Sequence, residues 1–414
     1  MPICLNVEEL KPGMKLFQAV CNEYTVLLPA GKVLEQCDVD ALRRKYQDMG
    51  VMIADPLLDE IVDFQDNTKD RETASRSRAT MSKALGNVRK RLTGRTTIRS
   101  ADILGLQQLT TDVLKYLKEN PVTAILLEKT HNSDTYLQEH SSNVFYISML
   151  VGNAIKSYIL EERQRLSRSN HLERSYALNL TPLAMGCMLQ DIGMLSFQDI
   201  YSSVTKLTPE QRSRLETHPV VGEKMLPQSL SSVARMVVRT HHENFDGTGY
   251  PLKVPGAKLH VFTRIIRVAD AFDAAISPRV YKKAKSEVKV LWEMNDGPAR
   301  EQFDPVITKV FSNMLHPFPI GAKVKLSNGM TGVVVRQSRH SAFRPNVIIA
   351  FDQAGNRLPK EQLKPPIQLH LHKDLKIVAL GSEDLSYLYT VAPVQSDAVT
   401  QAQQQVELAG RANP

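Results

Sequence analysis

The sequence contains few cysteines and no closely spaced cysteine pair. Its four cysteines are Cys4, Cys21, Cys37 and Cys187, and none of them forms a Cys-x-x-Cys pair. This spacing argues against a cysteine-rich zinc module, and it is typical of free thiols in a reducing compartment. We therefore expect a cytoplasmic protein.

Long apolar runs are also missing. The most apolar stretch, Val144–Ile159, contains Asn153 and Lys156 and is shorter than the roughly 20 residues that cross a bilayer. The first residues lack a basic region followed by an apolar region, which is the pattern of a signal peptide. We expect no transmembrane segment and no signal peptide, and we expect 144–159 to be a buried helix.

Aromatic residues are scarce, at 6%, whereas 52 Lys and Arg outnumber 44 Asp and Glu. The basic residues cluster at Arg89–Arg95 and Arg163–Arg174, without interleaved aromatics or a DNA-binding motif. Such clusters are typical of solvated helix faces and linkers. The net charge of +8 therefore does not predict binding to duplex nucleic acid.

A chain of 414 residues predicts two to three domains with a core of ordinary size. We expect a mainly α protein, in which a helical bundle is joined to a small α+β N-terminal domain and a small β-rich C-terminal appendage. The appendage could bind a ligand or partner, or cap the bundle. The expected segments are 1–63 (N-terminal domain), 64–100 (linker and helix), 101–316 (helical domain), 317–385 (β-rich domain) and 386–414 (disordered tail).

Local patterns predict the elements within these segments. The Pro29-Ala-Gly-Lys turn favours a β-hairpin over 24–34, and Asn328-Gly329 favours another over 322–336. The capping box at Thr208 starts a helix over 209–217, which would place His218 at its C-terminal end. The other expected elements are helices at 38–50, 101–120 and 122–131 and strands at 51–54, 346–352 and 376–380.

Two adjacent histidines, His241 and His242, precede a turn rich in glycine and proline. Neighbouring side chains on a helix diverge, so such a pair converges on one point only at a helix end or on irregular backbone. Asp246-Gly247 and Gly249 supply that break. Two imidazoles held in this way are typical ligands of a divalent metal. The alternative is a solvated pair at a helix C-terminus.

Other polar residues stand in apolar, helix-like surroundings elsewhere in the chain. Histidines and carboxylates that converge from several helices form di-metal sites in bundle cores. Mixed imidazole and carboxylate ligands suit Fe, Mn or Zn, and a carboxylate often bridges two ions. These candidate residues are His140, Asp191, His218, Asp270 and, one turn after it, Asp273.

The order of these motifs resembles the HD-GYP family, a subgroup of the HD phosphohydrolases. The matching motifs include His140, Asp191-Ile-Gly, His218-Pro, His241-His-Glu, Asp246-Gly-Thr-Gly-Tyr-Pro, Arg264-Ile, Val-Ala-Asp270 and Phe303-Asp-Pro. The resemblance covers about 101–315. It implies a helical domain with a metal centre that hydrolyses the bacterial messenger cyclic di-GMP to a linear dinucleotide or GMP. This anionic substrate, or the inner membrane surface, would account for part of the positive charge.

The resemblance also implies roles for individual residues. Asp191 would bridge two ions, one held also by His218, His241 and His242 and the other by His140, Asp270 and Gln190. Asp191, His218 and Asp270 would support catalysis, and Asp273 would orient a ligand histidine. For substrate binding, Arg279 and Lys282 would contact phosphate, while Gly249 would let the backbone approach and Tyr250 would contact a guanine. The alternatives are a surface Arg–Lys pair and a structural loop. Glu243 is expected either to support the ligands as Asp273 does or to be solvated.

This chain departs from the family pattern at several positions. Gln190 replaces the histidine of the His-Asp pair, Met194 replaces a lysine, and Tyr136 occupies the position of a third-metal glutamate. Residues 160–170 resemble an insertion in a helix connector. A glutamine offers only a neutral carbonyl oxygen, so we expect one intact and one weakened metal site. Two hypotheses follow: a slowed cyclic di-GMP phosphodiesterase, or a non-catalytic receptor that binds a cyclic dinucleotide or a signalling protein.

Overall fold

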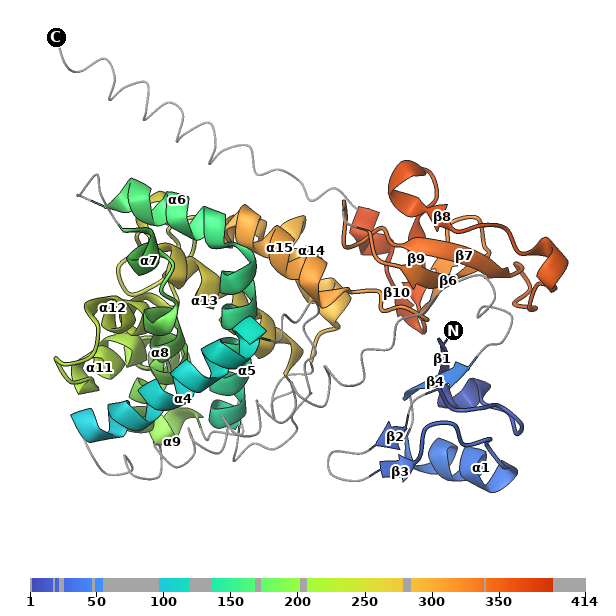
Figure 1. Ribbon diagram of the computed structural model, residues 1–414, viewed down its shortest axis with the longest axis horizontal. Coiled ribbons are helices and arrows are strands. Elements are labelled where there is room, and N and C mark those ends of the chain that lie inside the picture. The colour runs from blue at the N-terminus through green and yellow to red at the C-terminus, as the bar shows by residue number, and fades with distance from the viewer. Residues whose placement is uncertain are drawn as a thin grey trace, which may run out of the picture.

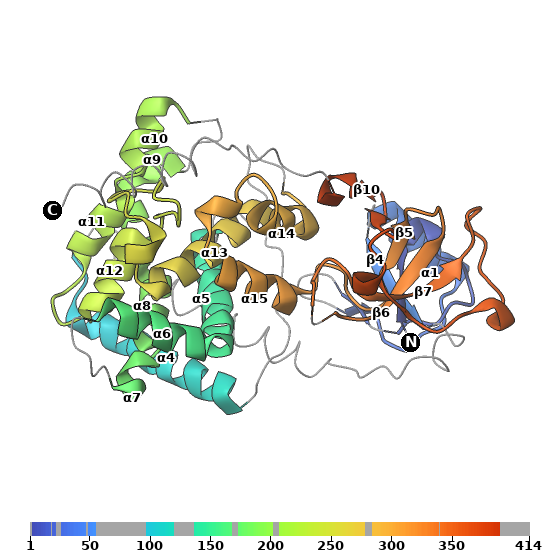
Figure 2. The same ribbon diagram turned by 90° about the horizontal axis from the view of Figure 1, so that it is seen from above.

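The structure is a computed structural model that describes residues 2–17, 19–21, 26–46, 49–54, 97–119, 136–167, 173–201, 207–277, 284–338 and 340–389. Figures 1 and 2 show most helices gathered in one lobe, and the strands from both ends of the chain, with helix α1 (Gln36–Lys45), in the other. The predicted fold class, a mainly helical core with small N-terminal strands and a β-rich C-terminal part, is confirmed.

The helical lobe is built around α5 (Tyr136–Ala154), which is buried from His140 to Gly152. A helix that is apolar on all sides belongs in the centre of a bundle, and α5 packs against α8 (Thr181–Leu189) and α13 (Val261–Ile276). The next helix outward, α4 (Ser100–Glu119), matches the predicted 101–120. The remaining helices of the lobe are α6 (Lys156–Leu166), α7 (Arg174–Ala177), α9 (Gln198–Tyr201), α10 (Pro209–Leu215), α11 (His218–Met225), α12 (Ser232–Thr240), α14 (Glu287–Asn295) and α15 (Pro305–Leu315).

The segment predicted to be a solvated connector is instead part of this lobe. Residues 156–166 form α6, and Arg163 is buried, with its Nη1 donating to the carbonyls of Tyr176 and Ala177 at 3.0 and 2.8 Å. Glu162 pairs with Arg264. Glu161 and Arg165 are exposed, as expected of a solvated helix face. The prediction was wrong for Arg163, because its partners lie on a neighbouring element that a sequence pattern does not reveal.

A buried ion pair ties α13 to the start of α15. Arg264 Nη1 donates to Asp304 Oδ2 at 2.6 Å, and the hydroxyl of Tyr158 donates to the same oxygen at 2.7 Å. The other carboxylate oxygen of Asp304 accepts from the backbone of Val306 at 2.9 Å and so caps α15. These contacts hold α6, α13 and α15 in one arrangement, which fixes the helix that carries Asp270.

The N-terminal unit pairs β1 (Pro2–Asn6) with β4 (Gly50–Ala54) and β2 (Val20–Cys21) with β3 (Val26–Leu28), both antiparallel. The predicted hairpin over 24–34 is wrong in its pairing, because β3 pairs with β2 and Val33 forms a bridge with Lys15. Helix α1 runs from Gln36 to Lys45 rather than over 38–50, because a capping box at Glu35 starts it earlier. The predicted helix over 122–131 and the basic stretch at 89–95 lie outside the described residues.

The C-terminal strands form one six-stranded antiparallel sheet of order β10-β9-β5-β6-β7-β8. As expected, β5 and β6 form a hairpin around Asn328-Gly329, where Gly329 has a φ of +83°. Residues 386–389 form a 3₁₀ turn inside the segment predicted as a tail. The strands are β5 (Lys323–Leu326), β6 (Thr331–Arg336), β7 (Asn346–Phe351), β8 (Ile367–Gln368), β9 (Ile377–Leu380) and β10 (Glu383–Asp384).

The two ends of the chain share a hydrophobic core. Val333 and Val335 of β6 pack with the buried residues of the N-terminal unit, whereas Val334 between them packs in a separate cluster with Val288 of α14. The backbone N–H of Cys4 also donates to the carbonyl of Gly321 at 2.8 Å. The sheet is therefore buried on both faces, by the N-terminal unit on one side and by α14 and the last residues of the sheet domain on the other.

One segment of the described residues, Arg174–Ile200, passes a test for membrane spans based on length and composition alone. In its most apolar window, 78% of the residues are buried inside the protein, and the segment is divided among α7, α8, η2 (Ile192–Phe197) and α9. A buried core segment passes the same test, so the segment is weak support for a membrane span.

Candidate metal centre

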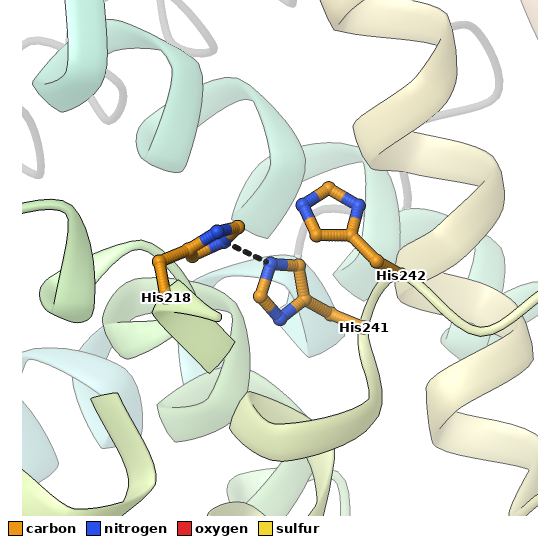
Figure 3. Close-up of side chains that lie close together, drawn as sticks. All are labelled: His218, His241 and His242. Atoms are coloured by element: carbon orange, nitrogen blue, oxygen red, sulfur yellow. Dashed lines mark hydrogen bonds between the residues drawn. The ribbon is translucent and has the colours of Figure 1, made fainter. Parts of the chain in front are cut away.

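Three histidines converge where α12 ends and α11 begins. His241 is the C-cap of α12, and the chain leaves the helix there, so His242 turns towards the same point as its neighbour. The metal-binding nitrogens of His218, His241 and His242 all lie within 4.8 Å of one another. Figure 3 shows the rings facing one another, with His218 Nε2 and His241 Nε2 3.2 Å apart. The adjacent histidines therefore converge at a helix end.

His218 reaches this point from the start of a helix, which corrects the predicted position at a helix end. Helix α10 ends at Leu215, and α11 begins at His218 with Pro219 in its first turn. Proline fits the first turn of a helix, where its missing N–H is not needed, so Pro219 marks a start rather than a stop. Helix α11 packs closely on η2, where a Cβ on Gly193 would lie 2.1 Å from the His218 carbonyl oxygen.

The backbone sets which nitrogens of these rings face the centre. The Nδ1 atoms of His218 and His241 lie 2.8 and 2.7 Å from the carbonyl oxygens of Leu215 and Val238. A carbonyl only accepts, so each Nδ1 carries the hydrogen and each Nε2 presents a lone pair. Burial, helped by His218, lowers the pKa of His241 to about 4. The two Nε2 atoms lie 3.2 Å apart, close enough for one cation to bind both.

Asp191 lies between the histidines of this group and His140. Its Oδ1 is 3.5 Å from His218 Nε2 and 3.9 Å from His241 Nε2, while its Oδ2 is 3.6 Å from His140 Nε2. Burial by itself would raise the pKa of this carboxyl, but the surrounding histidines, His218 foremost, hold it well below its usual range. An ionised carboxylate placed between two sets of imidazoles has the arrangement of a bridging ligand.

On the other side of Asp191, His140 is held between two carboxylates of α13. His140 Nδ1 is 2.7 Å from Asp273 Oδ2, and His140 Nε2 is 2.9 Å from Asp270 Oδ1. Asp273 also accepts from Asn143 Nδ2 at 2.8 Å, which fixes its orientation. The second oxygen of Asp270 is 3.5 Å from His242 Nδ1. The ring of Tyr136 stacks on His140, with centroids 5.5 Å apart.

Gln190 is fully buried beside His140. Its Nε2 is 3.4 Å from His140 Nε2, a contact that is longer and poorer than a normal hydrogen bond. Its Oε1 is buried and has no hydrogen-bond partner among the described residues. A buried carbonyl oxygen without a donor is costly, and a metal ion or a water at this place would satisfy it.

The loop after the histidines is shaped by its own packing. Glu243 is buried, which rules out the solvated alternative, and it accepts from the backbone N–H groups of Leu252, Lys253 and Val254. A Cβ on Gly249 would lie 2.3 Å from the backbone nitrogen of Asn244, which accounts for this glycine without a ligand. Glu243 is buried and Gly249 has no room for a side chain because the loop folds back on itself, which its sequence did not reveal.

Of the remaining residues predicted to contact substrate, Tyr250 lies beside the centre, with its ring centroid 4.8 Å from that of His242. Arg279 and Lys282 lie outside the described residues. Arg267, whose Nη1 is 4.0 Å from Asp270 Oδ2, was not predicted from the sequence. Its spacing of three residues before Asp270 on a helix could have indicated it.

The donors of this site fit a divalent metal. The described residues bring together two imidazoles with inward lone pairs, a central carboxylate and a carbonyl oxygen without a partner. Imidazole, carboxylate and amide oxygen together are ligands of transition metals and not of a structural cysteine site.

Comparisons with known proteins agree with this geometry. A sequence model described as HD domain matches residues 159–307. The chain is 32% identical over 178 residues to a cyclic di-GMP phosphodiesterase of Pseudomonas aeruginosa, covering 42% of each protein. It is 27% identical over 233 residues to a cyclic di-GMP phosphodiesterase of Thermotoga maritima, covering 54% of this chain and 59% of that relative. The matches thus span less than two thirds of either relative.

Among solved structures, a protein of Bdellovibrio bacteriovorus described as a HDG"Y"P protein aligns over 75% of this chain and 98% of that one. The identity is 15% and the TM-score is 0.28, too low for a residue-level comparison. The sequence matches and the buried histidines and aspartates of the site lead to the same family. The chain contains an HD domain of the HD-GYP type, with homologues named cyclic di-GMP phosphodiesterases.

Proposed function

We propose that the chain is a metal-dependent phosphodiesterase that hydrolyses cyclic di-GMP to a linear dinucleotide or GMP in the bacterial cytoplasm. The observation that carries the proposal is the position of Asp191, with one oxygen 3.5 Å from His218 and the other 3.6 Å from His140. This carboxylate could serve two ions at once. Relatives named cyclic di-GMP phosphodiesterases support the choice of substrate.

The ligands of the proposed centre fall into two sets that share Asp191. One set contains His218, His241 and His242, and the other contains His140, Asp270 and Gln190. Bound divalent ions, with Fe or Mn favoured and Zn also compatible, would supply a water of lowered pKa and neutralise charge on the phosphate. Gln190 offers a neutral oxygen where a histidine would bind more strongly, so the second set is the weaker one.

The residues around these ligands position them and the substrate. The carbonyls of Leu215 and Val238 keep Nε2 of His218 and His241 directed inward, and Asp273 does the same for His140. Asp191, His218 and Asp270 form the proposed catalytic core. Beyond it, Tyr250 offers a ring and a hydroxyl to a guanine, and Arg279 and Lys282 remain the proposed phosphate contacts.

The test is turnover of cyclic di-GMP under anaerobic conditions by protein loaded with Fe(II) or Mn(II), with the products separated by chromatography. We expect a linear product that depends on the metal and disappears in Asp191→Ala, which should also lose bound metal because both sets share this residue. Normal metal content in Asp191→Ala would contradict the bridging role. No product from the loaded wild-type protein would contradict the enzymatic proposal.

A second candidate function is a receptor that binds a cyclic dinucleotide or a signalling protein without turnover. The observation that favours it is Gln190, whose unpartnered Oε1 replaces the imidazole expected there. A receptor would bind metal at the three histidines and bind cyclic di-GMP in calorimetry, yet give no product. Turnover by the wild-type protein above the level of Asp191→Ala would exclude this candidate.

A further inference from the structure

Within the described part of the chain, the centre is most exposed beside His242 and Arg267. The side chains of His218, His241 and His140 are 4%, 0% and 4% exposed, whereas that of His242 is 21% exposed and that of Arg267 is 16% exposed. An anion that reaches the centre from solvent would therefore pass His242 and Arg267.

Arg267 is held at this opening by contacts that leave part of its guanidinium unused. Its Nε donates to Asn244 Oδ1 at 2.7 Å, and its Nη2 has a long contact of 3.5 Å to Gln302 Oε1. Its Nη1 is 4.0 Å from Asp270 Oδ2, which is too far for a hydrogen bond. The ring of Phe303 supports the guanidinium at 4.9 Å. The group is thus fixed in place with donors still available.

The guanidinium of Arg267 lies beside a carboxylate of the centre without a hydrogen bond to it. Among the described residues, no other arginine or lysine lies within 4.0 Å of a carboxylate of the centre. A fixed guanidinium with available N–H groups binds phosphate oxygens well, because its planar fork matches their geometry.

We propose that Arg267 binds a non-bridging oxygen of the substrate phosphate at the open side of the centre. This role rests on the proposed phosphodiesterase function, because it requires a phosphate held next to Asp270 and His242. It makes Arg267 a substrate-binding residue, additional to the predicted Arg279 and Lys282. Its Nε contact to Asn244 keeps the remaining donors directed towards the centre.

A purely structural role would have a different signature. Asn244 also donates from Nδ2 to Thr248 Oγ1 at 2.9 Å, so Arg267 could act only by holding the loop that follows the histidines. In that case Asn244→Ala, which removes both of these ties but keeps the guanidinium, would have the same effect as removal of the arginine. A binding role predicts a larger loss in Arg267→Gln than in Asn244→Ala.

The experiment titrates inorganic phosphate into full-length, metal-loaded protein by calorimetry, with metal content measured for each variant. We expect Arg267→Gln to weaken phosphate binding by roughly 10- to 100-fold, since a hydrogen bond to a charged group is lost. Metal content should be unchanged, because Arg267 is no ligand, and Arg267→Lys should recover part of the affinity. Arg300→Gln is the charge-matched control, since Arg300 is exposed and pairs with its neighbour Glu301; it should bind phosphate as the wild type does.

Three results would overturn the inference: unchanged phosphate binding in Arg267→Gln, an equal loss in Asn244→Ala, or loss of metal from Arg267→Gln. Wild-type protein that binds no phosphate would overturn it as well. These results are separable from failure of the proposed function. Phosphate binding can depend on Arg267 even if cyclic di-GMP is not turned over, and turnover can be normal in Arg267→Gln.

Discussion

In the proposed centre, the residue at position 190 would set how strongly one of the two ligand sets binds metal. Gln190 contributes a buried oxygen without a partner, where an imidazole would be a stronger ligand. We expect Gln190→His to raise the number of metal ions bound per chain and to increase turnover of cyclic di-GMP by at least about 10-fold, the scale of losses at metal-supporting positions. Metal analysis and steady-state kinetics on the same preparation would measure both effects.

Gln190→Ala is the matched control, because it removes the oxygen without adding an imidazole. It should bind no more metal than the wild type and should be no more active. If Gln190→His gains neither metal nor activity, the weakness lies elsewhere, and Met194, at the position of the missing lysine, is the next residue to change.

The residues of the centre could be proposed from sequence because their chemistry is unusual in its context. Histidines and aspartates such as His140 and Asp270, inside apolar helices, have few structural explanations, so their type and order are informative. Arg267 was missed because an arginine three residues before an aspartate is common on solvated helix faces. The burial of Glu243 could not be predicted, because it depends on how the loop after it folds back.

At the scale of elements, the site depends on close contact between η2 and α11. Gly193→Ala would place a Cβ 2.1 Å from the His218 carbonyl oxygen and 2.7 Å from the nitrogen of Gly222. The two elements must separate, so Asp191 and His218 would move apart. We expect a loss of roughly 1–3 kcal/mol or more in the free energy of unfolding, together with weaker metal binding, as measured by denaturant titration and metal analysis.

Gly105→Ala is the matched control for this substitution. A Cβ on Gly105 meets nothing within 4 Å, and the residue lies inside α4, where alanine is favoured over glycine by about 1 kcal/mol. This variant should be as stable as the wild type or more stable, with normal metal content. A Gly193→Ala protein with the same properties would contradict the proposed role of the close contact.

The N-terminus of α13 carries a titratable cap. His260 Nδ1 accepts from the N–H of Phe262 at 3.1 Å, and burial, with Arg163 and Arg264 nearby, lowers the pKa of His260 to about 3. The folded state therefore holds His260 neutral, whereas the unfolded chain protonates it near pH 6.5. Its contribution to stability is complete above about pH 6.5 and is lost as the pH falls towards 3.

His260→Asn tests this pH dependence, since asparagine is a good helix cap that does not titrate. The wild type should lose about 2 kcal/mol more than the variant in free energy of unfolding between pH 7 and pH 5, because each pH unit below the unfolded pKa costs about 1.4 kcal/mol. Denaturant titrations at both pH values measure the difference. Equal losses in the two proteins would show that protonation of His260 does not destabilise the folded state.

Element boundaries were predictable where a local signal was complete. The capping box at Thr208 and the Asn328-Gly329 turn gave the start of α10 and the β5–β6 hairpin, because each depends on a few neighbouring residues. The boundary at His218 was misplaced because Pro219 can follow one helix or begin the next. The pairing of β3 with β2 depends on contacts that local signals do not specify.

At the scale of the whole molecule, the two ends of the chain form one lobe. Sequence analysis separated residues 1–63 from 317–385, because nothing in either segment indicates the other at such a distance along the chain. The continuous apolar run Val333–Val335 of β6 is the one local sign, since a strand buried on both faces shows no alternation. Its side chains pack alternately against the N-terminal unit and against the cluster that contains Val288 of α14.

Two neighbouring valines allow a test of this architecture with the same substitution on opposite faces of one strand. Val333 and Val334 are both fully buried, the first against the N-terminal unit and the second in the cluster with Val288. Each Val→Ala change should cost about 2 kcal/mol, from two lost methyl groups and the cavity they leave. In amide hydrogen exchange, Val333→Ala should speed exchange in β1 and β4, whereas Val334→Ala should speed it in α14.

In both variants, exchange in α5 should stay slow, because this helix lies in the separate core of the helical lobe. If Val333→Ala leaves β1 and β4 unchanged, the N-terminal unit does not depend on the sheet for its stability. If both variants affect both faces equally, the β lobe opens as a single unit, and a signal received by the N-terminal unit could reach α14 through the sheet. Helix α14 packs against α13, so the second result would connect the N-terminal unit to the helix that carries Asp270.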